Sequence, residues 1–305
     1  NGTGTLTLAG SNAYTGSTTV SAGTLKAGST SSFGSNSAVT VAAGATMDLG
    51  GFNNTISSLS TATGTITNSG ASANLTITSV GSGAAQLFTG NLGVVLNTST
   101  PFSNANNTYS GGTYLTNGRI IWSGNVGVGT PGALTNGIYG TGAFTIGNST
   151  ASTAQLYFQG QTFNNAIVVN SAQGTGGSEL GAFRIAGGGT IAGAINANLA
   201  DATFNSLNAG QAASVTGAIS GNSGVVIMTQ SAGVLNITLN ATSGANTYAG
   251  NTTISTANAT LTLGKADQIS NGAGKGNLII TSGTFKMGGF SETINGLSGN
   301  GTVDG

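Results

Sequence analysis

One short phrase recurs three times along the chain, and this recurrence constrains the fold more than any other feature of the sequence. The phrase has the pattern Asn-x-Tyr-x-Gly, followed by hydroxyl-bearing and β-branched residues. It occupies residues 12–20, 107–115 and 246–254. Similarity at long range is typical of repeat proteins, in which each unit buries its apolar face against its neighbours. The phrase therefore indicates a structural array before it indicates any chemistry.

The composition is unusual for a globular domain, yet it is not that of a disordered chain. Only 4% of the 305 residues are charged, and 54 are glycine, whereas about 25% are charged in an average soluble domain. However, 38% of the residues are hydrophobic and the mean hydropathy is +0.17. Disorder combines low hydrophobicity with high net charge, and here the net charge is zero. We therefore predict that the chain is folded.

Short segments in which apolar residues alternate with threonine are spread along the whole chain. This period of two is typical of half-buried strands, and β-branched residues suit a pleated surface. Glycine interrupts every window with helical periodicity. The clearest segments are residues 5–8, 39–41, 64–67, 74–77, 236–239 and 260–263. The sequence therefore predicts an all-β chain.

Short strands at intervals of roughly eight residues fit either a sandwich or a solenoid. Long-range repetition favours the solenoid, and so do the Gly and Asn residues at most corners, which adopt left-handed conformations easily. Asn and Thr also form hydrogen-bonded ladders between stacked coils. The predicted fold is a β-solenoid with a single continuous core.

Three imperfect modules are visible, at about 1–96, 97–236 and 237–305. In each module a Phe-containing phrase follows the Tyr phrase, at separations of 38, 54 and 42 residues, so the second module carries an insertion. Six aromatic residues recur in equivalent phrases, and we interpret them as structural repeat anchors: Tyr14, Tyr109, Tyr248, Phe52, Phe163 and Phe290. Because both ends of the sequence fall inside a module, we expect part of a longer array, or a subunit that stacks end to end through its strand edges.

Residues 2–25 show the repeat in its fullest form, with an alternating Thr-Leu run before the Tyr14 phrase and Gly-Thr-Leu after it. This stretch resembles the autotransporter-associated β-strand repeat of bacterial passenger domains. The second copy departs from it at residues 117–120 and the third at residues 257–259. The resemblance implies a right-handed parallel β-helix, on or outside the surface of a Gram-negative-type bacterium. It implies no activity, since passengers with this fold include adhesins, enzymes and inert stalks.

Residue types that carry catalysis or bind metals are scarce. The chain has no His and no Cys, which excludes histidine-based triads, thiol nucleophiles and nearly all zinc sites. Two acid pairs are spaced by about one coil, Glu179 with Asp201 and Asp267 with Glu292, and two acids suffice for polysaccharide chemistry. Isolated surface acids are the commoner arrangement. We therefore predict no enzyme activity, no cofactor and no metal site.

Charge and hydropathy argue against two classes of partner. The six basic residues are scattered, without the basic stripe that nucleic-acid binding requires. No apolar run approaches the roughly 20 residues of a membrane helix. A dinucleotide-like glycine pattern at residues 127–132 contains Pro131 and precedes no helical pattern, so we interpret it as a turn.

The leading hypothesis is a structural extracellular β-solenoid, a segment of a bacterial surface stalk or fibre. The alternative is an adhesin that binds glycans or other cells through the insertion at residues 120–160. There Trp122 is either a platform on which a sugar stacks or a side chain that packs in a core or on a sheet face. Two further hypotheses stay open. They are ice binding by Thr-x-Thr rows and a polysaccharide enzyme that uses Glu179 and Asp201.

Overall fold

The computed structural model divides the chain into two compact units. The structure describes residues 2–81, 84–99, 102, 104, 106–123, 138–172, 181–230 and 232–305, without the side chains of residues 121–123. Unit 1 comprises Asn1–Ile120 with Asn125–Phe144, and unit 2 comprises Ile121–Gly124 with Thr145–Gly305. Within the described ranges every regular element is a β-strand, which confirms the predicted all-β class.

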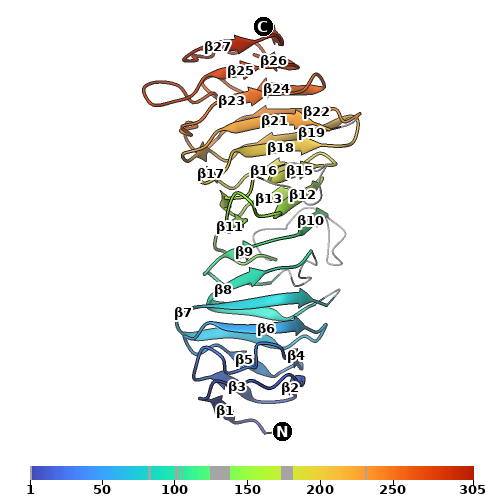
Figure 1. Ribbon diagram of the computed structural model, residues 1–305, viewed down its shortest axis with the longest axis vertical. Helices are drawn as coiled ribbons and strands as arrows, with labels where there is room; N and C mark the ends of the chain where they lie inside the picture. The colour runs from blue at the N-terminus through green and yellow to red at the C-terminus, as the bar shows by residue number, and fades with distance from the viewer. Residues whose placement is uncertain are drawn as a thin grey trace. The chain divides into compact units, whose positions relative to one another are not determined.

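Unit 1 consists of coils whose strands stack in parallel into two walls (Figure 1). The first wall contains β1 (Thr5–Leu8), β3 (Thr24–Ala27), β5 (Thr46–Asp48) and the starts of β7 (Thr65–Val80) and β8 (Leu87–Leu96). The second wall contains β2 (Thr18–Val20), β4 (Ala38–Val41), β6 (Asn54–Leu59), the ends of β7 and β8, and β9 (Thr113–Leu115). Strands β3 to β8 therefore each pair with strands of the coils before and after them.

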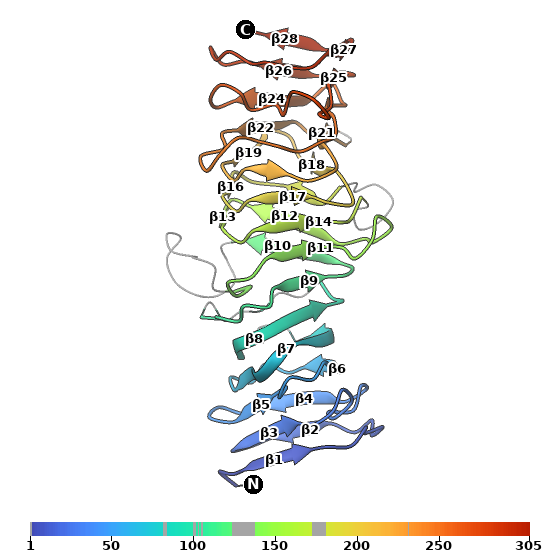
Figure 2. The same ribbon diagram turned by 90° about the vertical axis from the view of Figure 1, so that its left-hand side faces the viewer.

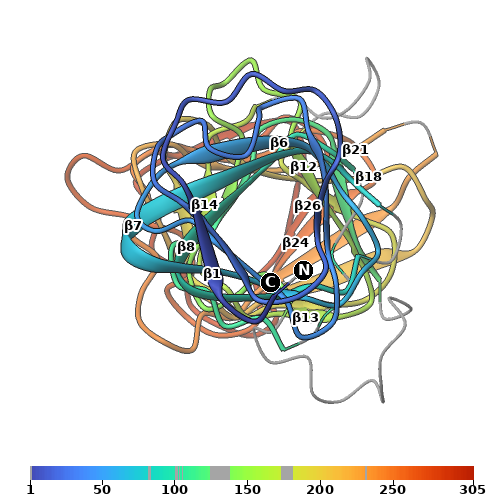
Figure 3. The same ribbon diagram turned by 90° about the horizontal axis from the view of Figure 1, so that it is seen from below.

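Strands β7 and β8 contribute to both walls because they turn a corner of the coil. Figure 3 looks along the stacking direction and shows how β6 and β7 follow the outline of the coil. The register between β7 and β8 shifts between Asn68 and Ala73, which marks the bend. At this bend a Cβ added to Gly70 would lie 2.5 Å from the backbone of Gly50. Only glycine allows the two backbones to approach so closely.

Unit 2 is built from three walls of parallel strands (Figure 2). One contains β14 (Ile167–Val169), β17 (Ile195–Ala197) and β20 (Ile219–Ser220). The next contains β12 (Gln155–Gln159), β15 (Phe183–Ile185), β18 (Ala202–Ser206), β21 (Val225–Thr229), β23 (Thr252–Ile254), β25 (Leu278–Ile280) and β27 (Leu297–Gly299). The last contains β13 (Thr162–Phe163), β16 (Thr190–Ile191), β19 (Gln211–Val215), β22 (Leu235–Leu239), β24 (Ala259–Leu263), β26 (Thr284–Lys286) and β28 (Thr302–Asp304). Strands β10 (Arg119–Ser123) and β11 (Phe144–Ile146) fall where the division between the units runs.

The alternating sequence pattern places apolar side chains inside each coil. In β22 and β24 the first, third and fifth side chains are buried and the other two are half-buried. The parallel register sets Ile237 beside Leu261, so like side chains form continuous files from coil to coil. Phe183 and Phe204 stack in the same way, with ring centroids 4.8 Å apart. Each fully buried apolar side chain contributes about 1.5–3 kcal/mol to the stability of the folded chain. The parallel stacking of strands from coil to coil confirms the predicted β-solenoid.

Candidate functional site

All three copies of the recurring phrase fold into a similar hydrogen-bonded unit, which we call the clasp. A clasp comprises an asparagine, a tyrosine two residues later, a glycine two residues after that, and a threonine after two more. The clasps are Asn12, Tyr14, Gly16 and Thr18; Asn107, Tyr109, Gly111 and Thr113; and Asn246, Tyr248, Gly250 and Thr252. The first two lie in unit 1 and the third lies in unit 2.

The asparagine of the clasp links neighbouring coils. Asn246 Nδ2 donates to the carbonyl oxygen of Gln268 on the following coil, and Asn246 Oδ1 accepts from the N–H of Ile219 on the preceding coil, both at 2.8 Å. Asn107 makes both bonds in the same manner. Asn12 donates to the following coil. An amide suits this position because it carries a donor and an acceptor on one planar group.

The tyrosine hydroxyl pairs with the threonine hydroxyl of the same clasp. The oxygen–oxygen distances are 2.9 Å for Tyr14–Thr18, 2.5 Å for Tyr109–Thr113 and 2.5 Å for Tyr248–Thr252. Tyr109 and Tyr248 are completely buried, whereas Tyr14 is 38% exposed. Burial raises the pKa of Tyr109 and of Tyr248, against the opposing effect of their threonine partners. Both buried phenols therefore stay neutral and act as hydrogen-bonding groups.

The glycine of the clasp lets adjacent coils touch. A Cβ on Gly250 would lie 2.5 Å from the backbone nitrogen of Gly224, and a Cβ on Gly111 would lie 2.6 Å from that of Gly93. Real Cβ atoms essentially never come so close to other atoms. Around Gly16, by contrast, nothing lies within 4 Å of the added Cβ. The second and third clasps thus bring coils together more tightly than the first.

The three phenylalanines of the repeat occupy two different environments. Phe163 is completely buried, while Phe52 and Phe290 are each 38% exposed. Each exposed ring follows two glycines with positive φ, in a turn closed by its own N–H on a carbonyl three residues earlier. This turn directs Phe52 and Phe290 outward. The anchor role assigned to the six aromatic residues stays a prediction, and their unequal burial makes it testable.

Two residues after each exposed phenylalanine, another side chain holds the neighbouring coil. Asn54 Oδ1 accepts from the N–H groups of residues 32 and 33, at 2.9 and 3.4 Å. The carboxylate of Glu292 accepts from the N–H groups of residues 268 and 269, at 2.8 and 3.1 Å. Burial raises the pKa of Glu292 and the nearby Asp267 adds to this, although the two N–H groups oppose it.

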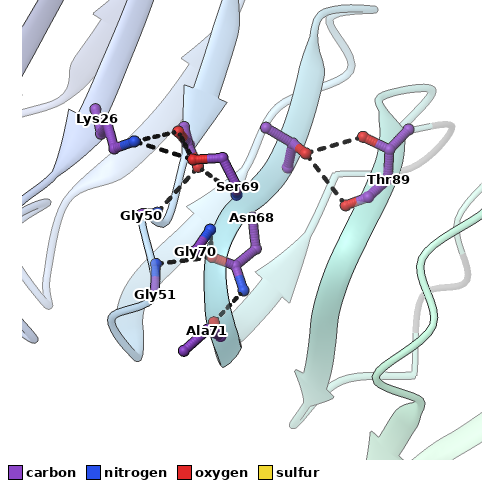
Figure 4. A network of polar contacts seen from close by, with 10 residues as sticks. Lys26, Gly50, Gly51, Asn68, Ser69, Gly70, Ala71 and Thr89 are labelled. Atoms are coloured by element: carbon purple, nitrogen blue, oxygen red, sulfur yellow. Dashed lines mark hydrogen bonds and ion pairs between the residues drawn. The ribbon is translucent and has the colours of Figure 1, made fainter.

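The corner of β7 is fixed by a cluster of polar contacts around Asp48, and Figure 4 labels its partners Lys26, Gly50 and Ser69. Lys26 Nζ lies 3.3 Å from Asp48 Oδ2, and the Ser69 hydroxyl donates to the same oxygen at 2.6 Å. The N–H groups of Ser69 and Gly50 donate to Oδ1, each at 2.9 Å. Burial alone would raise the pKa of Asp48, but these donors together hold it below its ordinary value.

Ser69 also accepts a hydrogen bond from Lys26 Nζ at 3.0 Å, so a serine, a lysine and an aspartate meet in this cluster. Nucleophilic catalysis would need a base that removes the serine proton. Asp48 is a weak base because its pKa is lowered and its oxygens already accept hydrogen bonds from neighbouring donors. The geometry therefore favours a role in holding the corner of the coil.

The acid pairs proposed from the sequence are only partly placed. Glu179 lies outside the described residues, while Asp201 Oδ1 accepts from the N–H of Gly224 at 2.6 Å. Asp267 and Glu292 lie close enough to interact electrostatically. In the part of the chain that the structure describes, no group of three or more acid, His or Cys side chains is placed to hold a metal ion. The side chain of Trp122 and the glycine pattern at residues 127–132 also lie outside the description.

Known proteins share sequence with two of the three clasps. The family model described as the passenger-associated transport repeat matches residues 1–27 and 102–121, which contain the first and second clasps. These two stretches are therefore similar to that repeat. The third clasp lies outside the matched residues but shares the geometry of the second.

One relative is a protein named "Adhesin BmaC autotransporter" from Brucella suis biovar 1 (strain 1330). It is 55% identical to this chain over 60 residues, which are 19% of this chain and 2% of the relative. No solved structure matches the chain. The repeat and this relative indicate a Gram-negative protein at the cell surface or outside the cell, which confirms the expected location.

No helix in the described segments is long and apolar enough to span a membrane.

Proposed function

We propose that this chain is a structural segment of a surface stalk or fibre, which holds other parts of a larger protein away from the cell. The observation that carries the proposal is the direction of the clasp's hydrogen bonds. The side-chain amides of Asn107 and Asn246 each donate one hydrogen bond and accept another, and both bonds go to backbone groups of neighbouring coils. These polar groups serve cohesion between coils and leave little to offer a ligand.

The low charge supports the same role. With 4% charged residues, cohesion depends mainly on apolar files and hydrogen bonds, which salt screens far less than surface ion pairs. No catalytic step is part of the proposal. Self-association through strand edges is a further part of it, because exposed β-edges pair readily, and sedimentation velocity at increasing protein concentration tests that part.

Electron microscopy of the purified chain tests the structural role. We expect elongated particles that keep their length when salt is raised to about 1 M, where the Debye length is roughly 3 Å. Particles that are only compact and globular would overturn the proposal. On cells, duplicating this segment within its parent protein should increase the distance from the outer membrane to the distal end.

A second candidate function is adhesion, and two observations favour it. The relative from Brucella suis carries "adhesin" in its name. In unit 1, Tyr114 of β9 points outward and is 37% exposed, so its ring offers a face on which a sugar can stack. If this function holds, Tyr114→Ala reduces binding on a glycan array or to host cells. Phe290→Ala, at a similarly exposed ring in unit 2, is the matched control and should leave binding unchanged.

A further inference from the structure

The third repeat carries a carboxylate where the first carries an amide, and both serve the same backbone groups. Glu292 and Asn54 each follow a Gly-Gly-Phe turn by two residues. Each accepts two consecutive N–H groups from the neighbouring coil, at residues 268–269 and 32–33 respectively. An amide oxygen is neutral at every pH, whereas a carboxylate gains or loses charge.

The surroundings of Glu292 make its charge unfavourable. Asp267, directly before Gln268, interacts with Glu292 as a like charge. Asp267 also adopts φ 55°, a left-handed conformation that non-glycine residues adopt infrequently. Among the described residues, the hydroxyl of Tyr248 also interacts with Glu292, and burial keeps this hydroxyl neutral. When Glu292 is ionised, two carboxylates on neighbouring coils therefore lie close together in a partly desolvated place.

Glu292 is also connected to the third clasp. It holds the N–H of Gln268, whose carbonyl oxygen accepts from Asn246 of the clasp. The side chain of Gln268 is buried, and its Oε1 accepts from the N–H of Ala241 at 2.7 Å. Three successive coils are thus joined through Gln268. A change at Glu292 acts on a residue that the clasp itself uses.

We propose that Glu292 is a pH-dependent latch between its own coil and the coil of Gln268 and Ile269, and that it holds more firmly when protonated. The neutral carboxyl group has no charge to desolvate and no repulsion with Asp267, and these two gains outweigh the hydrogen bonds from the two N–H groups, which favour the ionised form. The raised pKa of Glu292 agrees with this direction. Because the folded state then binds more protons than the unfolded state, the stabilisation is complete below the ordinary Glu pKa. It is lost as pH rises through the pKa of the folded state.

Hydrogen exchange of the two pairs of N–H groups tests the latch. From about pH 4 to about pH 8, which spans the range of shifted Glu pKa values, exchange rates are divided by the intrinsic rates of the unfolded chain. We expect residues 268–269 to lose protection as pH rises, while residues 32–33 behind Asn54 keep theirs. The Glu292→Gln variant should have a flat profile at residues 268–269, and Asp267→Asn should reduce the loss.

Two results would overturn the latch. The first is a profile at residues 268–269 that stays flat or rises with pH in the unmodified chain, and the second is the same loss in Glu292→Gln. A direct titration of the Glu292 carboxyl carbon by NMR gives a readout that needs no variant. A pKa at the ordinary Glu value there would count equally against the proposal.

Discussion

The first and third clasps share their residue types, yet they sit in different surroundings. Tyr14 and Tyr248 make the same hydroxyl contact, but Tyr14 is 38% exposed and Tyr248 is completely buried. The amide of Asn246 links two neighbouring coils, whereas that of Asn12 donates to one. The comparison teaches that the phrase determines the local hydrogen bond, while the packing of adjacent coils determines how much that bond contributes to stability.

The strongest test of this comparison removes both rings. We expect Tyr248→Ala to cost about 3–5 kcal/mol, the usual range for a large buried aromatic side chain, and Tyr14→Ala to cost about 1 kcal/mol or less, because its ring is partly solvated. Repeat proteins do not unfold in one step, so local opening free energies from hydrogen exchange are the suitable measurement. Tyr248→Phe separates the ring from the hydroxyl and should cost only about 0.5–1.5 kcal/mol. Equal costs at Tyr14 and Tyr248 would break the comparison.

The next test removes the asparagines. Asn246→Ala leaves the N–H of Ile219 and the carbonyl of Gln268 without these partners, and each unsatisfied buried group costs about 1–3 kcal/mol. Asn12→Ala removes one bond in a more exposed place, with an expected cost of about 1 kcal/mol. Exchange of the Ile219 N–H reports on the loss directly. If both variants opened equally, the idea of a two-sided link at Asn246 would fail.

The glycines give a smaller and more specific difference. Gly250→Ala places a methyl group 2.5 Å from the backbone of Gly224, and such overpacking costs about 1–3 kcal/mol. Gly16→Ala meets nothing within 4 Å and should change stability by less than about 0.5 kcal/mol. Hydrogen exchange of the N–H groups around Gly250 and Gly16 measures the difference as local opening free energies. A neutral Gly250→Ala would mean that the coils can separate at this point without loss.

We expect acid to give the smallest effect, and to change stability in opposite directions at Asp48 in unit 1 and at Glu292 in unit 2. The pKa of Asp48 is lowered, so the unfolded state binds more protons and the stabilisation is lost as pH falls through the ordinary and then the folded pKa. We expect the N–H groups of Gly50 and Ser69 to lose protection below about pH 4, and Asp48→Asn to lack this acid-dependent loss. In the same direction of pH change, the latch at Glu292 should tighten. Parallel responses in the two regions would contradict the opposite pKa shifts.

Much of the fold was predictable because it depends on short-range pattern. The alternation in residues such as 260–263 leaves one face apolar, and a period of two permits only a strand. The recurrence of Tyr14, Tyr109 and Tyr248 indicated stacked coils, because similarity at long range is typical of repeat proteins. The turn residues were also visible in outline, since the Gly-Gly before Phe52 can adopt the left-handed conformation, with positive φ, that the turn requires.

The candidate site was harder to predict, because it depends on which coil lies next to which. Sequence reasoning named the tyrosines as anchors and predicted asparagine ladders only in general terms, although Asn12, Asn107 and Asn246 recur just as regularly. The spacing from Asn246 to its partner Gln268 follows from the length of one coil, which varies with each loop. The unequal burial of Phe52 and Phe163 depends on the surrounding coils as well. Pattern identifies a repeated residue, but only the register of the coils shows what it holds.

The direction of the clasp's bonds has a mechanical consequence. Within each unit the asparagine bonds run from coil to coil, parallel to the bonds that pair the strands. A force along that direction stretches these hydrogen bonds along their own axes. They then break one coil at a time, instead of all being sheared at once. Coils fastened by a clasp should be the last to detach. Under an applied force, such a chain would extend in small steps as single coils unfold. The coils that contain a clasp would determine the highest force that the chain withstands.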